Sequence, residues 1–217
     1  MDRIKFVSLL TLAFIGAGLQ AQPWTAQELI AANTAEFVPC ISEEEKNAIK
    51  YLNLARMFPK KFAQTELKAY ITERQGRGTE FEHEIELRKT LMTMKPVGRL
   101  VFNKSLYESA ACFTAELATK PTMTCQRTSC PGGAFSKEFV YFSLGQDECK
   151  GRDIVLAELC TNDLPSNGRD YYKTLLSPTL VSAGISIHIK PLPQKEYCCV
   201  LDFSDGQDPK TAQNNPE

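Results

Sequence analysis

The sequence is poor in histidine, with only His83 and His188 among its 217 residues. Neither has a second histidine four residues away, as a helical metal pair requires, and neither lies near a nucleophile in the sequence. The eight cysteines include no Cys-x-x-Cys pair, which argues against a zinc site. The segment Pro131-Gly132-Gly133 lacks the Lys-Ser/Thr of a phosphate-binding loop. With 25 basic and 26 acidic residues, the chain also lacks a basic excess for nucleic acid. We therefore expect no metal, no cofactor and no nucleic-acid partner.

The N-terminus has the pattern of an export signal. Arg3 and Lys5 precede a short apolar run over residues 6–19, and Leu19-Gln20-Ala21 ends the pattern. The apolar run is too short to cross about 30 Å of hydrocarbon. We expect residues 1–21 to be a signal peptide that is removed. The mature chain is then secreted or periplasmic and has no transmembrane segment.

All eight cysteines lie after this signal, where an oxidising compartment favours disulfides. Eight cysteines allow 105 pairings, so the sequence does not define the connectivity. Cys125 and Cys130 close a short loop and are the local bridge that we expect. Cys198 and Cys199 are neighbours on an expected strand, so their side chains should point to opposite faces.

Residue patterns predict helices packed against a small antiparallel sheet. Ser42 and Glu45 form a capping box that begins the first long helix, which Pro59 ends. Apolar residues at helical spacing predict a helix over 105–119, and Asp153 is placed as the N-cap of a helix over 153–160. Strand patterns occur over 139–143, 184–190 and 197–203, and further helices are expected over 62–71, 81–94 and 170–175. We expect a lead over 22–41, one α+β domain over 42–204 and a flexible polar tail over 205–217.

Four segments together resemble the CAP superfamily, the cysteine-rich secretory, antigen-5 and pathogenesis-related proteins, whose bacterial members carry SCP-like domains. The chain is identified as a divergent bacterial member. The resemblance implies an α-β-α sandwich, with helices flanking a small antiparallel sheet and a cleft on one side of it. The segments are Tyr51–Pro59 ("lN-x-x-R-x-x-P"), Asn103–Ala110 ("L-x-x-x-A"), Leu175–Pro178 with Ala183–Ile187, and the closing strand Tyr197–Phe203.

The departures from the family pattern concern the metal-binding cleft that the resemblance implies. Phe113 stands where the family has a helix histidine, and Arg169 or Tyr171 stands where it has the second. The first acid is replaced by Val140, with Glu138 two residues earlier, and the second appears as Thr161 or Asn162. A phenylalanine cannot ligate a metal, and tyrosine replaces a neutral imidazole poorly. The metal set is expected to be lost.

The remaining cleft candidates are Phe113, Glu138, Asn162, Arg169 and Tyr171, and we expect Phe113, Glu138 and Tyr171 to converge on one pocket. His83 is interpreted as part of a solvated helix face, and His188 as a surface or partner contact. The hypothesis that follows is an exported, non-catalytic domain that binds a protein, glycan or lipid partner through the degraded cleft. The alternatives are a protease-like hydrolase, using Glu138 and Tyr171 or a metal held in another way, and a lipid or sterol carrier.

Overall fold

The fold is taken from a computed structural model of the chain. The expected signal peptide, most of the expected tail, Cys125, Asn162 and Arg169 lie outside the residues that the structure describes. The described residues are 24–74, 81–120, 126–133, 135–144, 149–161, 171–190 and 196–206.

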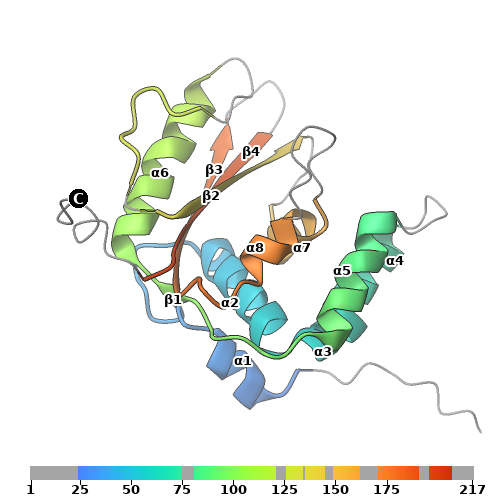
Figure 1. The fold of residues 1–217 in the computed structure, drawn as a ribbon. Helices are drawn as coiled ribbons and strands as arrows, with labels where there is room; N and C mark the ends of the chain where they lie inside the picture. The colour runs from blue at the N-terminus through green and yellow to red at the C-terminus, as the bar shows by residue number, and fades with distance from the viewer. Residues whose placement is uncertain are drawn as a thin grey trace, which may run out of the picture.

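A four-stranded sheet forms the centre of the molecule, in the order β1-β3-β4-β2 (Figure 1). β3 (Ser182–Lys190) and β2 (Lys137–Leu144) each pair antiparallel with β4 (Glu196–Ser204). β1 (Val101–Phe102) pairs with β3 in parallel. The sheet is therefore mixed, and the expectation of a purely antiparallel sheet is wrong at β1. This two-residue strand is too short to produce an alternation pattern in the sequence.

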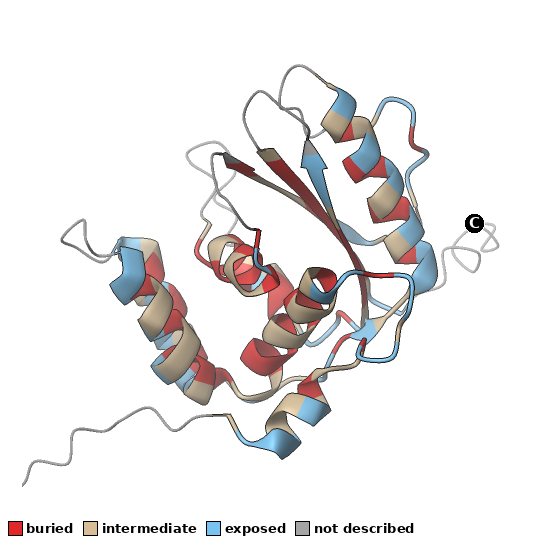
Figure 2. Ribbon diagram, turned by 180° about the vertical axis from the view of Figure 1, so that it is seen from behind, coloured by how far each residue is buried: buried red, intermediate tan, exposed pale blue. Residues whose placement is uncertain are grey.

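Helices cover both faces of the sheet, which confirms the α+β class. α6 (Lys104–Thr119) lies along one face, while α2 (Glu43–Met57) and α7 (Gly151–Leu159) lie on the other (Figure 1). The buried side of α6 faces the strands and its other side is exposed (Figure 2). The predicted apolar stripe on α6 is confirmed, because all four of its residues are buried: Leu106, Ala110, Phe113 and Leu117.

The two faces of the sheet have separate apolar clusters. Cys198 and Val200 of β4 pack with Phe113 on the α6 side, whereas Cys199 and Leu201 belong to the larger core on the α2 side. The prediction that Cys198 and Cys199 point to opposite faces is confirmed. Within the described residues, no helix combines the length and the apolar character that a membrane span needs.

Capping boxes begin the first two helices. Ser42 accepts a hydrogen bond from the Glu45 amide at the start of α2, as predicted. Thr25 and Glu28 make the same arrangement at α1 (Ala26–Ala32). The Asn53 amide nitrogen on α2 donates to the Ala32 carbonyl at 2.9 Å. The part of the lead that the structure describes is thus packed on the domain.

A helical arm follows α2 and leaves the sheet. It consists of α3 (Pro59–Phe62), a π-helical turn η1 (Ala63–Leu67), α4 (Lys68–Arg74) and α5 (Glu82–Thr93). α8 (Tyr171–Leu175) precedes β3. The N-cap of α7 is Lys150, so the prediction of Asp153 as N-cap is wrong. Helical geometry begins earlier because Glu44 of α2 accepts the Gly151 amide at 2.7 Å, a tertiary contact that no local pattern contains.

The disulfide that the structure contains joins Cys112 on α6 to Cys130, 18 residues later. The expected Cys125–Cys130 bridge is wrong, because Cys130 is bonded to the helix instead. Bonds of this kind persist in oxidising compartments. We expected the cysteines to pair in disulfides, but four described residues have free thiols: Cys40, Cys149, Cys160 and Cys199.

Candidate functional site

The sequence-predicted candidates lie on two different faces of the sheet. Glu138 and Phe113 lie on the α6 face, where both contact Arg127. Tyr171 packs on the other face, with its ring 5.0 Å from that of Phe139. Successive strand residues point to opposite faces of the sheet. Glu138 therefore meets Arg127 on one face, and Phe139 meets Tyr171 on the other. The prediction that Phe113, Glu138 and Tyr171 line one pocket is therefore wrong for Tyr171.

Arg127 is the centre of the charged cluster on the α6 face. Its Nε donates to Glu138 Oε2 at 2.7 Å, and its Nη2 contacts the same oxygen. Nη2 also donates to Asp202 Oδ2 at 3.2 Å. The guanidinium carbon lies 4.5 Å from the centroid of the Phe113 ring and 5.0 Å from that of Phe135. We call these five residues the Arg127 cluster.

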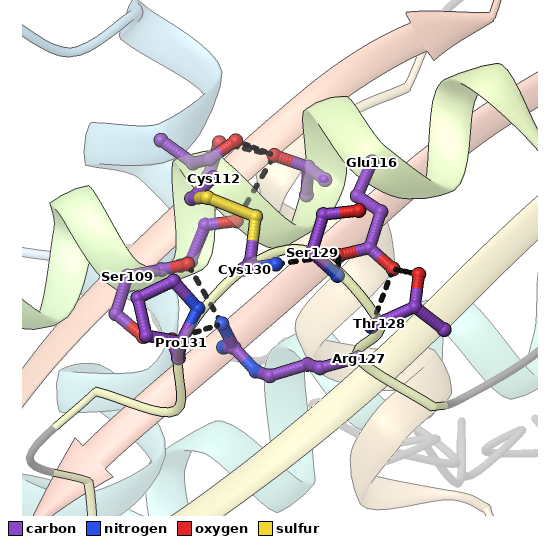
Figure 3. The surroundings of a disulfide bond; sticks show 12 residues. Ser109, Cys112, Glu116, Arg127, Thr128, Ser129, Cys130 and Pro131 are labelled. Carbon is purple, nitrogen blue, oxygen red and sulfur yellow. Dashed lines mark hydrogen bonds between the residues drawn. A yellow bond between two sulfur atoms is a disulfide. The ribbon is translucent and has the colours of Figure 1, made fainter.

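The disulfide and Glu116 hold the segment that carries Arg127 against α6 (Figure 3). The Glu116 carboxylate accepts the backbone amides of Thr128, Ser129 and Cys130 at 2.7–3.0 Å. Hydrogen bonds from Lys120 and then from Thr128 hold the pKa of Glu116 well below its ordinary value. A carboxylate that stays ionised can accept all of these donors. Glu116 therefore holds the backbone that follows Arg127, while Glu138 and Asp202 hold its guanidinium.

The Arg127 cluster supplies its own cation to its acids. A guanidinium keeps its proton throughout the physiological range, so Arg127 acts as a permanent counter-ion. Glu138 directs its Oε2 to that cation. Among the described residues, no group of three histidine, cysteine or acidic side chains is arranged to hold a metal ion. The ion pairs of Arg127 with Glu138 and Asp202 join the segment before β2 to two strands of the sheet.

Asp202 makes the stability of the cluster dependent on pH. Burial raises the pKa of Asp202 from 3.8 to about 7, with Glu138 adding to the shift and Arg127 opposing it. A carboxyl with a raised pKa in the folded state stabilises the fold below its unfolded pKa, and this contribution is lost as the pH rises through the folded pKa. Between pH 4 and pH 7.5, the free energy of unfolding should therefore fall by about 2–4 kcal/mol more in the wild type than in Asp202→Asn.

Urea unfolding at several pH values measures this difference. Both proteins keep all other titrating groups, so the difference between the two curves reports Asp202 together with its interaction with Glu138 and Arg127. Parallel curves would contradict the assignment.

A cavity of about 820 Å³ lies on the opposite face, between the helical arm and the layer formed by β2 and α7. α4 and the start of α5 form one wall, and Tyr141 of β2 lies in the other with residues of α7. Aromatic, charged and small side chains mix in this lining: Tyr70, Glu73, Arg74, Phe81, His83, Tyr141, Asp153, Ala157, Cys160 and Thr161.

An ion pair joins α4 to α5 at the cavity. Arg74 Nη1 lies 3.5 Å from Oε1 of the buried Glu84, and its guanidinium stacks 5.1 Å from the centroid of the Tyr70 ring. The His83 ring stacks on Phe81, with centroids 5.5 Å apart and planes 7° apart. The interpretation of His83 as part of a solvated helix face is wrong, because its half-buried ring lines the cavity. His188 is exposed on β3, as the surface interpretation requires.

Burial keeps the cavity hydroxyl and thiol groups protonated. It raises the pKa of Tyr70 and of Tyr141 above the ordinary phenol value. It also raises the pKa of the Cys160 thiol to about 12. At neutral pH these groups can donate hydrogen bonds but do not act as bases or thiolate nucleophiles.

The residues that sequence reasoning missed differ in how visible they were. Asp202 had a signal, because an acid on an otherwise apolar strand face needs a buried partner. Arg127 had a weaker signal, because it lies three residues before Cys130 in the sequence. Tyr70, Arg74 and Tyr141 had none, since nothing local indicates that α4 and β2 face the same cavity.

The comparison with known proteins assigns neither a family nor a function to the chain. No protein-family model matches the chain, and no curated protein matches it.

Proposed function

We propose that the chain is an exported, non-catalytic domain of SCP type that binds a protein, glycan or lipid partner. The binding site is the cavity between α4, α5, β2 and α7. The observation that carries this proposal is the size and mixed lining of the cavity, about 820 Å³ with aromatic, charged and hydroxyl groups. Ligand sites in proteins have volumes of about 300–1,000 Å³ and combine aromatic walls with a few polar groups.

Contacts between the resembling segments support the SCP assignment. Arg56, from the "lN-x-x-R-x-x-P" segment, donates to the carbonyls of Leu175 and Ser177 at 2.7 and 2.9 Å. Gly184, from the segment that follows, lies against the backbone of α6 at Tyr107. Each of these two contacts joins segments that lie far apart in the sequence. The layered arrangement, with α6 on one face and α2 and α7 on the other, is compatible with an α-β-α sandwich.

The Cys112–Cys130 disulfide supports export, in agreement with the signal expected over residues 1–21. Binding without catalysis is supported by the separation of Glu138 from Tyr171 and by the pairing of Glu138 with Arg127. The two residues proposed for a hydrolase cannot reach one substrate atom from opposite faces of the sheet. The burial-raised pKa values of the cavity tyrosines support the same conclusion.

Filling the cavity tests the proposal. Ala157→Trp places a large ring on the α7 wall and should abolish ligand retention, while Ala111→Trp on α6 changes the other face of the sheet. Affinity selection with oligosaccharide, lipid and peptide libraries, read by mass spectrometry, should find one class that the wild type and Ala111→Trp retain and Ala157→Trp loses. Retention of no class, or equal retention by both variants, overturns the proposal.

A metal titration tests the non-catalytic part separately. Zinc, calcium and magnesium should each leave the thermal midpoint unchanged at stoichiometric concentration. A stoichiometric increase in the midpoint that Glu138→Gln removes would restore a metal-dependent hydrolase.

A further inference from the structure

We infer that the ligand of this cavity is a neutral oligosaccharide, bound against the Phe81–His83 ring stack. The inference rests on the proposed function and specifies its ligand. Three properties of the cavity carry it: an exposed aromatic platform, donors and acceptors on both walls, and a charge arrangement that disfavours other ligand classes.

The aromatic platform is the paired ring system of Phe81 and His83. The two rings are parallel within 7° and stacked, with centroids 5.5 Å apart, so one face of each ring is turned to the other. Phe81 keeps 52% of its surface exposed although it is a large apolar side chain. The flat C–H face of a pyranose ring stacks on such a surface, which removes both from water. Tyr70 and Tyr141 add two further rings to the same cavity.

Polar groups around the platform match a ligand with many hydroxyls. Arg74 donates only, Glu73 accepts only, and the Tyr141 hydroxyl can do both. The side chains of Glu73 and Arg74 are 63% and 44% exposed, so both remain open to a ligand. Asp153 is 40% exposed at the α7 wall. A sugar hydroxyl both donates and accepts, and this mixed set satisfies both functions.

The charges in and next to the cavity disfavour an anionic ligand. Among the described residues in and next to the cavity, carboxylates outnumber guanidiniums. The carboxylates belong to Glu66, Glu73, Glu84 and Asp153, and the guanidiniums to Arg74 and Arg152. Arg152 already lies within 3.5 Å of three of these acids. Fatty acids, phosphates and sulfated glycans would meet this acidic excess.

A cationic ligand and a lipid tail are disfavoured for other reasons. Arg74 occupies the face of Tyr70 at 5.1 Å, where a ligand cation would stack. A lipid tail is bound best where hydrophobic side chains predominate in the lining, and charged and hydroxyl side chains interrupt this one. Among the described lining residues, only Ala157 and Cys160 offer a small apolar side chain. A neutral polyhydroxylated ligand fits the remaining surface.

Calorimetric titration of the full chain tests the inference. The probes are neutral tri- and tetrasaccharides of glucose, galactose, mannose or N-acetylglucosamine, with palmitate and a lysine-rich peptide as the other classes. Phe81→Ala removes the platform, and Phe81→Trp keeps a ring there. Phe37→Ala is the matched control, because Phe37 is 90% exposed and does not line the cavity.

At least one neutral oligosaccharide should bind the wild type, Phe37→Ala and Phe81→Trp, with an affinity about tenfold or more weaker in Phe81→Ala. Oligosaccharide binding that does not change in Phe81→Ala overturns the inference. Palmitate or peptide binding without oligosaccharide binding also overturns it, while the proposed binding function survives if Ala157→Trp abolishes that binding. Failure of all three classes overturns both.

Discussion

Arg56→Met should lower the free energy of unfolding by about 4 kcal/mol, the largest effect that we expect from one substitution. Arg56 is fully buried, and its guanidinium donates to four backbone carbonyls at 2.7–2.9 Å. These carbonyls belong to Gly98, Leu175, Ser177 and Leu180. Methionine fills part of the volume but leaves these acceptors without a donor, and hydrogen bonds to charged groups contribute about 1.5–3 kcal/mol each, not additively.

Chemical denaturation of Arg56→Met and of two further variants measures the effect. Arg99→Met is the matched control: Arg99 is exposed and its side chain donates to the Ala31 carbonyl at 3.3 Å, so its loss should cost under about 1 kcal/mol. Arg56→Lys should be intermediate, because an ammonium cannot reproduce the planar fork of the guanidinium. Equal stability of Arg56→Met and Arg99→Met would show that the buried hydrogen bonds do not hold α2 to the segment before β3.

Gly184→Ala should lower the free energy of unfolding by about 3 kcal/mol. A Cβ at Gly184 would lie 2.0 Å from the backbone nitrogen of Tyr107 and 2.3 Å from the carbonyl carbon of Leu106. Both are backbone atoms of α6, so the clash is relieved only if the helix moves away from the sheet. Overpacking of this kind costs about 1–3 kcal/mol and occasionally more.

Gly98→Ala is the control for this prediction, because a Cβ there would meet no atom within 4 Å. Its stability should stay close to that of the wild type. Movement of α6 in Gly184→Ala would also displace Phe113. The amide NMR signals of the Arg127 cluster should therefore shift in this variant. An unchanged spectrum and an unchanged midpoint in Gly184→Ala would show that α6 does not pack on β3 at this distance.

Local patterns predicted the elements where a short segment contains all of the relevant chemistry. Ser42 and Glu45 complete a capping box within four residues, so the start of α2 was predictable. The stripe on α6 reflects one buried face, which repeats along the segment. The β-prone residues of β3 and β4 predicted both strands, although β4 is buried on both faces. These predictions needed no knowledge of a distant partner.

The predictions that failed each depended on a partner outside the segment. Cys130 could bond to any thiol that the fold brings near it, and α6 brings Cys112. Tyr171 was expected beside Phe113, but the strand that separates them sends Glu138 and Phe139 to opposite sides. His83 was expected in solvent because its helix neighbours are charged, and the wall opposite to it comes from β2 and α7.

The sequence by itself determined the long helices, the capping box of α2 and the β3–β4 pair, because periodicity and capping are properties of neighbouring residues. The tertiary structure alone decided that Arg127 meets Glu138 and Asp202 on one face, while Tyr70, Phe81 and Tyr141 surround a cavity on the other. These groupings join side chains as far apart as 75 residues. Long-range contacts depend on how every layer packs at once, and a single segment carries no record of the residue that will lie opposite to it.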